Sequence, residues 1–200
     1  MKKILKNIIA EFYKDDLPDG FNRSIEIPKL PQNIRKAIVF IGMRRVGKTY
    51  LMYQHMKDAL SKGLDKKKLL YINFEDDRLQ AFSTKDFQTI LDVYFEMYPE
   101  YINSKDLIFY FDEIQNIDGW EKFIRRLLDK EKMNIFITGS SSKLLSVEIA
   151  TSLRGRCLVN EVFPLGFQEY LNFIGIYDFK NITSKEKAVI RHHFENYLKK

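Results

Sequence analysis

An eight-residue segment restricts the fold more than any other feature of this 200-residue chain. The segment reads Gly42-Met43-Arg44-Arg45-Val46-Gly47-Lys48-Thr49, which follows the pattern G-x-x-x-x-G-K-[ST]. It comes after an apolar run, residues 37–41, that predicts a buried strand, and it opens a stretch of helical periodicity, residues 49–63. A strand, a glycine-containing loop and a helix in this order are what a phosphate-binding loop requires.

The chemistry of such a loop explains its spacing. Main-chain N–H groups point inward around a phosphate, and glycines permit the positive φ values and the close approach that this needs. The helix N-terminus adds a partial positive charge. Lys48 would neutralise the β and γ phosphates, and the Thr49 hydroxyl would bind Mg²⁺. We therefore predict nucleotide contacts from residues 42–49 and from Tyr50. The alternative is a tight turn with a surface lysine, and Arg44 and Arg45 either contact phosphate or are solvated.

The rest of the chain alternates between strand and helix patterns. Further strands are predicted over residues 68–74, 106–113, 133–140 and 157–163, and further helices over residues 1–14, 83–98, 119–131, 142–153, 166–175 and 184–200. The last of these helices has no packing partner that the sequence identifies. Strands that alternate with helices predict an α/β fold, with a parallel sheet covered on both faces.

The strand at residues 106–113 ends in two acids, Asp112 and Glu113. Ligands of open α/β sheets bind at the carboxyl ends of the strands, so these acids are predicted to lie near the loop. Asp112 would hold Mg²⁺ together with Thr49. Glu113 would be catalytic with Lys48, because a second carboxylate that the metal does not consume can orient the attacking water. The alternative is a solvated pair at an ordinary strand end.

Two further pairs of residues are candidates for the site. Thr138 and Ser140 end the strand at residues 133–140, and either hydroxyl could contact the γ phosphate or the attacking water, or could cap the next helix. Arg154 and Arg156 flank Gly155. An arginine here could stabilise charge in the transition state, often from a neighbouring subunit, or could belong to a solvated basic turn.

Composition restricts the partners and the compartment. The formal net charge is +6, but the basic residues are scattered, so direct nucleic-acid binding by this segment is the less favoured interpretation. A single cysteine, Cys157, excludes an internal disulfide. No apolar run approaches the ~20 residues of a membrane span, and we expect a cytoplasmic location. The amphipathic N-terminal helix is predicted to dock on the body, with a membrane-surface anchor as the alternative.

Five blocks of sequence resemble one family. They read IGMRRVGKTYL, YINFEDDRL, FYFDEIQNIDGWE, IFITGSSSKLLSVEIATSLRGR and VFPLGFQEYL. In this order they resemble the prokaryotic AAA-like P-loop ATPases of the archaeal-type ATPase superfamily, related to the AAA+ and STAND classes. The resemblance implies a five-stranded parallel sheet in the order 5-1-4-3-2, with ATP as the nucleotide. It also implies Walker A at residues 42–49, Walker B at Asp112 with catalytic Glu113, a sensor at the end of strand 133–140, and Arg154 and Arg156 near a subunit edge.

Three segments are expected along the chain. Residues 1–33 form a helix and connector, residues 34–178 form the ATPase core, and residues 179–200 begin a helical lid or a following domain. The resemblance allows a homo-oligomer, and a DNA or protein client bound through a region beyond residue 200. The predicted function is Mg²⁺-dependent ATP hydrolysis. The rivals are a nucleotide-loaded switch or scaffold that hydrolyses slowly, and a small-molecule or nucleoside kinase, for which the sequence shows no second substrate pocket.

Overall fold

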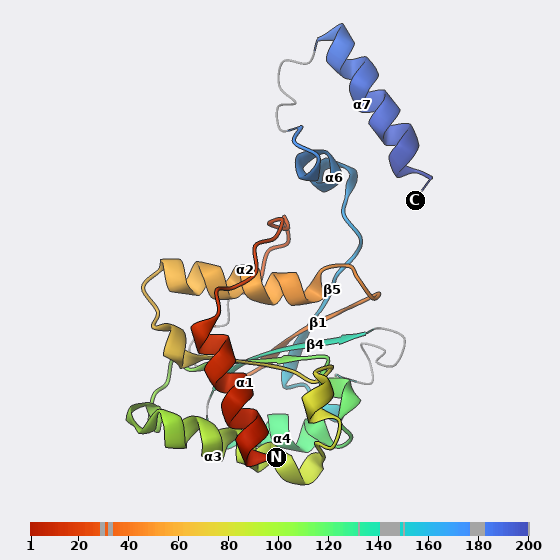
Figure 1. Cartoon of the computed structure of the whole chain (residues 1–200). Coiled ribbons are helices and arrows are strands. Elements are labelled where there is room, and N and C mark those ends of the chain that lie inside the picture. The colour runs from red at the N-terminus through yellow and green to blue at the C-terminus, as the bar shows by residue number, and fades with distance from the viewer. Residues whose placement is uncertain are drawn as a thin grey trace.

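A five-stranded parallel sheet forms the centre of the protein (Figure 1). The computed structural model describes residues 1–28, 31, 34–131, 133–140, 149, 151–176 and 183–199, with Ser140 described for its main chain alone. The strands are β1 (Ala37–Gly42), β2 (Leu69–Asn73), β3 (Ile108–Asp112), β4 (Asn134–Ser140) and β5 (Cys157–Glu161). Their spatial order is β2-β3-β4-β1-β5. This order confirms the predicted α/β fold and the order 5-1-4-3-2, counted from the other edge.

Helices cover both faces of the sheet. The α-helices in the described residues are α1 (Lys2–Lys14), α2 (Lys48–Ser61), α3 (Phe87–Met97), α4 (Trp120–Arg126), α6 (Phe167–Phe173) and α7 (Ser184–Tyr197). A π-helical turn, Leu127–Glu131, continues α4, and single 3₁₀ turns lie at Lys66–Lys68, Asp77–Leu79, Thr84–Asp86, Pro99–Tyr101 and Ile114–Asn116. Most of the helix predicted over residues 142–153 falls outside the described residues.

The strand β1 shows how the sheet divides the core. Every residue of β1 is buried, as expected for a central strand of a parallel sheet. Successive side chains point to opposite faces, so Val39 joins the apolar cluster beneath α3 and α4, while Phe40 joins the cluster beneath α2. The amphipathic helix α1 packs against α3 and the edge strand β2, with Leu5 and Ile9 fully buried.

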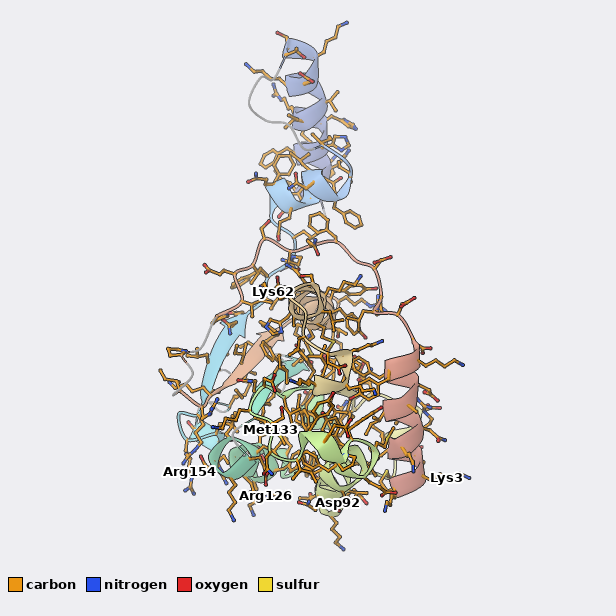
Figure 2. The ribbon with its side chains drawn as sticks, turned by 90° about the vertical axis from the view of Figure 1, so that its left-hand side faces the viewer. Lys3, Lys62, Asp92, Arg126, Met133 and Arg154 are labelled. Atoms are coloured by element: carbon orange, nitrogen blue, oxygen red, sulfur yellow. The ribbon has the colours of Figure 1, made fainter. Side chains whose placement is uncertain are left out.

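Two helices lie beyond β5, away from the sheet (Figures 1 and 2). α6 and α7 pack against each other through aromatic rings: Phe167 meets Phe194 edge-on at 4.9 Å between ring centroids. The Tyr197 hydroxyl donates to the Leu165 carbonyl at 2.8 Å. The C-terminal helix, whose partner the sequence did not identify, therefore packs on α6. Among the helices that the structure describes, none combines the length and the apolar character needed to cross a bilayer.

Candidate functional site

The loop between β1 and α2 is shaped by two glycines. Gly42 has a φ of 152°, and a Cβ atom there would lie 2.3 Å from the Val162 carbonyl oxygen. Only glycine lets the chain that follows β5 approach β1 so closely. Gly47 has a φ of 94°, in the left-handed region, and immediately precedes the first residue of α2. The segment therefore turns from strand to helix at the carboxyl edge of the sheet, as the motif predicts.

The Lys48 side chain folds back inside this loop. It is 5% exposed, and its Nζ donates to the carbonyl oxygens of Gly42 at 3.2 Å and Met43 at 3.0 Å. The same Nζ lies 3.5 Å from Oε1 of Glu113. The loop thus presents a buried cation whose donors are taken up by its own main chain and by the carboxylate that the sequence predicts to be catalytic.

Asp112 ends β3 beside the loop and is 1% exposed. Its Oδ2 accepts hydrogen bonds from the hydroxyls of Thr49 and Tyr71, both at 2.8 Å, and its Oδ1 accepts one from Thr138. Burial raises the pKa of the Asp112 carboxyl, and the three hydroxyl donors act in the opposite direction. The two predicted metal ligands, Thr49 and Asp112, are therefore in direct contact.

Glu113 is held on several sides. Its φ of 50° is in the left-handed region, which is uncommon for a residue with a Cβ atom. Its main-chain N–H donates to the Thr138 hydroxyl at 2.9 Å, and its Oε2 accepts from Gln115 Nε2 at 2.5 Å. Thr138 therefore connects Asp112 and Glu113. The Thr138 hydroxyl donates to Asp112 in this structure. Its contact with the γ phosphate or the attacking water stays a prediction.

Several predicted nucleotide contacts lie at the rim of this site. The side chains of Met43, Arg44 and Arg45 are exposed, as is Tyr50, whose ring meets that of Tyr53 edge-on. Exposure favours the solvated interpretation of both arginines. The side chain of Ser140, the other sensor candidate, lies outside the described part of the structure.

Arg154 and Arg156 are not brought to the loop of their own chain. Both precede β5, and Figure 2 shows Arg154 at the end of the sheet where β5 begins. Cys157 pairs with Ala37 at the start of β1, whereas the loop follows the end of β1. Five residues of strand separate the two edges by about 16 Å. Arg156 instead binds Asp129 at 2.8 Å.

Three residues of the site were missed by sequence reasoning: Tyr71, Gln115 and Arg23. Tyr71 looks like an ordinary strand aromatic, and its position beside Asp112 follows from the β2–β3 register, in which Asn73 pairs with Asp112. Gln115 lies two residues after Glu113, so its spacing was a weak signal. Arg23 lies in an irregular connector, where no local pattern marks it, yet it is buried and its Nη1 donates to the Val46 carbonyl of the loop at 2.6 Å.

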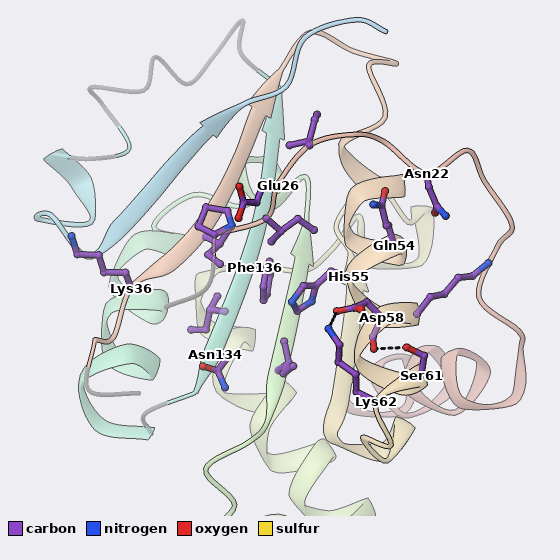
Figure 3. A pocket seen from close by; sticks show the side chains of 17 residues that line it. Asn22, Glu26, Lys36, Gln54, His55, Asp58, Ser61, Lys62, Asn134 and Phe136 are labelled. Atoms are coloured by element: carbon purple, nitrogen blue, oxygen red, sulfur yellow. Dashed lines mark hydrogen bonds and ion pairs between the residues drawn. The ribbon is translucent and has the colours of Figure 1, made fainter. Parts of the chain in front are cut away.

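A cavity of about 780 Å³ lies elsewhere, between the C-terminal half of α2 and the first residues of β1, β3 and β4 (Figure 3). It is therefore at the edge of the sheet opposite the loop. His55 lies in it, with Nδ1 2.7 Å from the Tyr110 hydroxyl and its ring 4.2 Å from that of Phe136. Burial lowers the pKa of His55 to about 4. This cavity holds none of the predicted site residues.

Comparison with known proteins assigns the chain to a family. A family model described as an AAA domain matches residues 34–171. The chain belongs to the AAA domain family. Of the proteins similar to this AAA domain, one from Methanocaldococcus jannaschii, named "Uncharacterized protein MJ1544", is 43% identical over 182 residues, which are 89% of this chain and 37% of that protein. An uncharacterized protein of Haemophilus influenzae is 34% identical over 152 residues, 76% of this chain and 35% of that protein.

The AAA domain thus spans little more than a third of the length of these two relatives. Among solved structures, a DNA replication initiation factor aligns with a TM-score of 0.49 and 20% sequence identity, over 82% of this chain and 51% of that chain.

Proposed function

We propose that this AAA domain binds ATP with Mg²⁺ and hydrolyses its terminal phosphoanhydride bond. One observation carries the proposal: Lys48, Thr49, Asp112 and Glu113 come together from the loop, α2 and the end of β3. A cation, a hydroxyl and two carboxylates are the groups that phosphoryl transfer to water requires. Membership of the AAA family supports the choice of ATP.

The donor set at Asp112 fits Mg²⁺. Thr49 Oγ1 and Asp112 Oδ2 are hard oxygen donors in contact at 2.8 Å. In the part of the chain that the structure describes, no three His, Cys, Asp or Glu side chains cluster as a metal site. The pair formed by Thr49 and Asp112 suits Mg²⁺, because this ion keeps several waters and binds through one or two protein ligands and the phosphates of the nucleotide. When bound, it would neutralise charge that develops on the phosphates.

Lys48 would bind the phosphates first, and this would release Glu113 to act on the attacking water. An ammonium group has three donors, which in this structure face two carbonyls and Glu113. Phosphate oxygens would replace these partners, because a triphosphate carries more negative charge than two neutral carbonyls and one carboxylate together. Glu113 would then be free to accept a proton from a water and to aim that water at the γ phosphate. Thr138 would keep the main chain of Glu113 and the carboxylate of Asp112 in register.

Two variants test this proposal. Lys48→Ala should abolish ATP binding, because the loop loses its only side-chain cation directed inward. Glu113→Gln should keep ATP binding and lower the rate of phosphate release by a factor of about 10² to 10⁴, the usual contribution of a positioned base. Glu100→Gln, an exposed acid, serves as the matched control. Binding is measured with a fluorescent ATP analogue, and turnover as phosphate released without an added acceptor, which also separates hydrolysis from kinase activity.

The contacts of Glu113 favour a second candidate function. Lys48 and Gln115 both hold its carboxylate, so hydrolysis would be slow until those contacts open. A nucleotide-dependent switch or scaffold that acts through protein or DNA partners would have this property. Turnover unaffected by Glu113→Gln, with tight ATP binding retained, would support the switch over the ATPase.

Arg154 and Arg156 would take part only from a neighbouring copy of the chain, because they lie at the opposite edge of their own sheet. We therefore propose that the chain forms a homo-oligomer in which these arginines reach the site of a neighbouring copy. Mixing Glu113→Gln chains with Arg154→Ala/Arg156→Ala chains tests it. Turnover in the mixture above that of either variant alone would support shared sites, and the absence of any recovery would leave the arginines as surface residues.

A further inference from the structure

Arg23 is a buried cation that the proposed chemistry does not use. Its guanidinium makes four hydrogen bonds: Nε to Glu169 Oε1 at 3.0 Å, Nη2 to Glu169 Oε2 at 3.2 Å and to the Phe163 carbonyl at 2.9 Å, and Nη1 to the Val46 carbonyl at 2.6 Å. A guanidinium offers five N–H donors in one plane. Arg23 therefore joins the connector, the chain that follows β5, α6 and the phosphate-binding loop at a single point.

The main chain around Arg23 is anchored as well. Its N–H donates to Gln54 Oε1 at 2.9 Å, and its carbonyl accepts from Gln54 Nε2 at 3.1 Å, so the connector is fastened to α2. Glu169 also accepts from the main-chain N–H groups of Ser24 at 2.8 Å and Gly166 at 3.0 Å. Burial acts to raise the pKa of Glu169, but these hydrogen bonds hold it below its ordinary value, so the carboxylate is charged at neutral pH.

The contact with Val46 has a consequence for the loop. A peptide bond is planar and trans, so its carbonyl and the N–H of the next residue point in opposite directions. Arg23 holds the Val46 carbonyl, and the N–H of Gly47 is thereby directed away from Arg23. Because Gly47 has no Cβ atom, it can adopt either sign of φ, and the peptide before it can turn over unless something holds it. In this structure its φ is 94°. In loops of this kind, main-chain N–H groups of the glycine-rich turn cradle the phosphates.

We propose that Arg23, held by Glu169, is a positioning residue that fixes the Val46–Gly47 peptide so that the Gly47 N–H is ready to bind a nucleotide phosphate. The proposal rests on the proposed function, because it names the residue that pre-organises the same loop. It also means that α6, which supplies Glu169, contributes to nucleotide affinity without touching the nucleotide.

Nucleotide affinity of the whole chain tests the proposal. Arg23→Lys keeps the charge but offers one ammonium for acceptors on two sides, so ATP and ADP should each bind about tenfold more weakly, the equivalent of one hydrogen bond to a charged group. Glu169→Gln should weaken binding in the same direction and by less. Arg78→Lys is the matched control, because Arg78 also bridges carboxylates, Glu11 and Asp76, but lies on the surface.

A second readout reports the peptide itself. In a ¹H–¹⁵N spectrum, the Gly47 amide proton should move downfield when ADP binds the wild-type chain, because a phosphate oxygen accepts its hydrogen bond. In Arg23→Lys this shift should shrink, even at saturating ADP. If Arg23 only stabilised the fold, Arg23→Lys would lower the midpoint of thermal unfolding but would leave this chemical shift change and the nucleotide affinity of the folded chain unchanged.

The outcomes separate the two proposals. Wild-type affinity and a wild-type Gly47 shift in both Arg23→Lys and Glu169→Gln, with Lys48→Ala still unable to bind, would overturn the role of Arg23 and leave the proposed function standing. If the wild-type chain binds no nucleotide, the proposed function fails and this inference fails with it. Weakened binding in both variants, with Arg78→Lys unaffected, supports the positioning role.

Discussion

At the scale of single residues, the environment of Asp112 shows how this chain keeps a carboxylate in its interior. Three hydroxyls surround it, and two of them, Tyr71 and Thr138, come from strands on either side of β3. A buried carboxylate needs such donors, because burial without hydrogen bonds penalises the charged form heavily. Tyr71 is in turn met by the hydroxyl of Tyr53 at 3.2 Å, so a chain of phenols leads from α2 to the acid.

Removing the Tyr71 hydroxyl should therefore be costly. Tyr71→Phe leaves the buried Asp112 carboxylate with one donor fewer and should lower the free energy of unfolding by about 1–3 kcal/mol. Tyr53→Phe is the matched control and should cost less, because that hydroxyl bonds to a neutral phenol rather than to a carboxylate. Urea unfolding at pH 7 measures both. Equal stability of Tyr71→Phe and wild type would show that the hydroxyl contributes nothing to holding the acid.

At the scale of elements, a half-buried histidine packs between α2 and the sheet. His55 lies between α2 and β4, against Phe136, with Tyr110 of β3 as its hydrogen-bond partner (Figure 3). Burial is the main reason that its pKa falls to about 4; the nearby Asp58 acts to raise it and Lys62 to lower it. Between pH 4 and 6.5, the unfolded chain binds a proton at this residue that the folded chain does not.

The sign of the pH dependence follows from this difference. Stability from His55 is fully present above pH 6.5 and is lost as the pH falls toward 4, by up to about 3 kcal/mol at the lower end. His55→Gln keeps a hydrogen-bonding group for Tyr110 and should remove this part of the dependence. His192→Gln, on the exposed face of α7, should not. Urea unfolding at pH 5 and pH 7 gives the free energy of unfolding at each pH. If His55→Gln loses as much stability between pH 7 and pH 5 as the wild type does, the assignment of this pH dependence to His55 is wrong.

At the scale of the whole molecule, stability is distributed unequally. The sheet and its covering helices share large apolar clusters, whereas none of the described residues of α7 is buried. Elements with little buried apolar surface open at a lower free-energy cost than the global transition. The helix α7 should therefore behave as a separate, weaker unit, whereas α6 is anchored by buried Leu171 and by the contact of Glu169 with Arg23.

Two phenylalanines test this division. Phe123 packs against Phe87 at 4.6 Å inside the core, so Phe123→Ala should lower the free energy of unfolding by about 3–5 kcal/mol. Phe194 on α7 is 43% exposed, so Phe194→Ala should lower the free energy of unfolding by less than about 1 kcal/mol. Hydrogen exchange should show α7 amides exchanging well before those of β1 and β3. Protection of α7 equal to that of β1 would mean that the two parts unfold together.

The sequence by itself determined the strand–loop–helix unit and the alternation of strands and helices, because periodicity and glycine placement act over a few residues. It also placed Asp112 and Glu113 at the correct edge, because the carboxyl ends of parallel strands share one edge. The order of the strands came from family resemblance, since no local pattern specifies which strands are neighbours.

Only the tertiary structure decided which side chains surround the acids and the loop. Tyr71 and Thr138 meet Asp112 across 41 and 26 residues of sequence, and Arg23 meets Glu169 across 146. It also placed Arg154 and Arg156 at the edge opposite the loop of their own chain. Such contacts depend on strand register and on the paths of irregular segments. A shift of one residue turns every side chain of a strand to the other face, and that choice is made by the packing of the whole core.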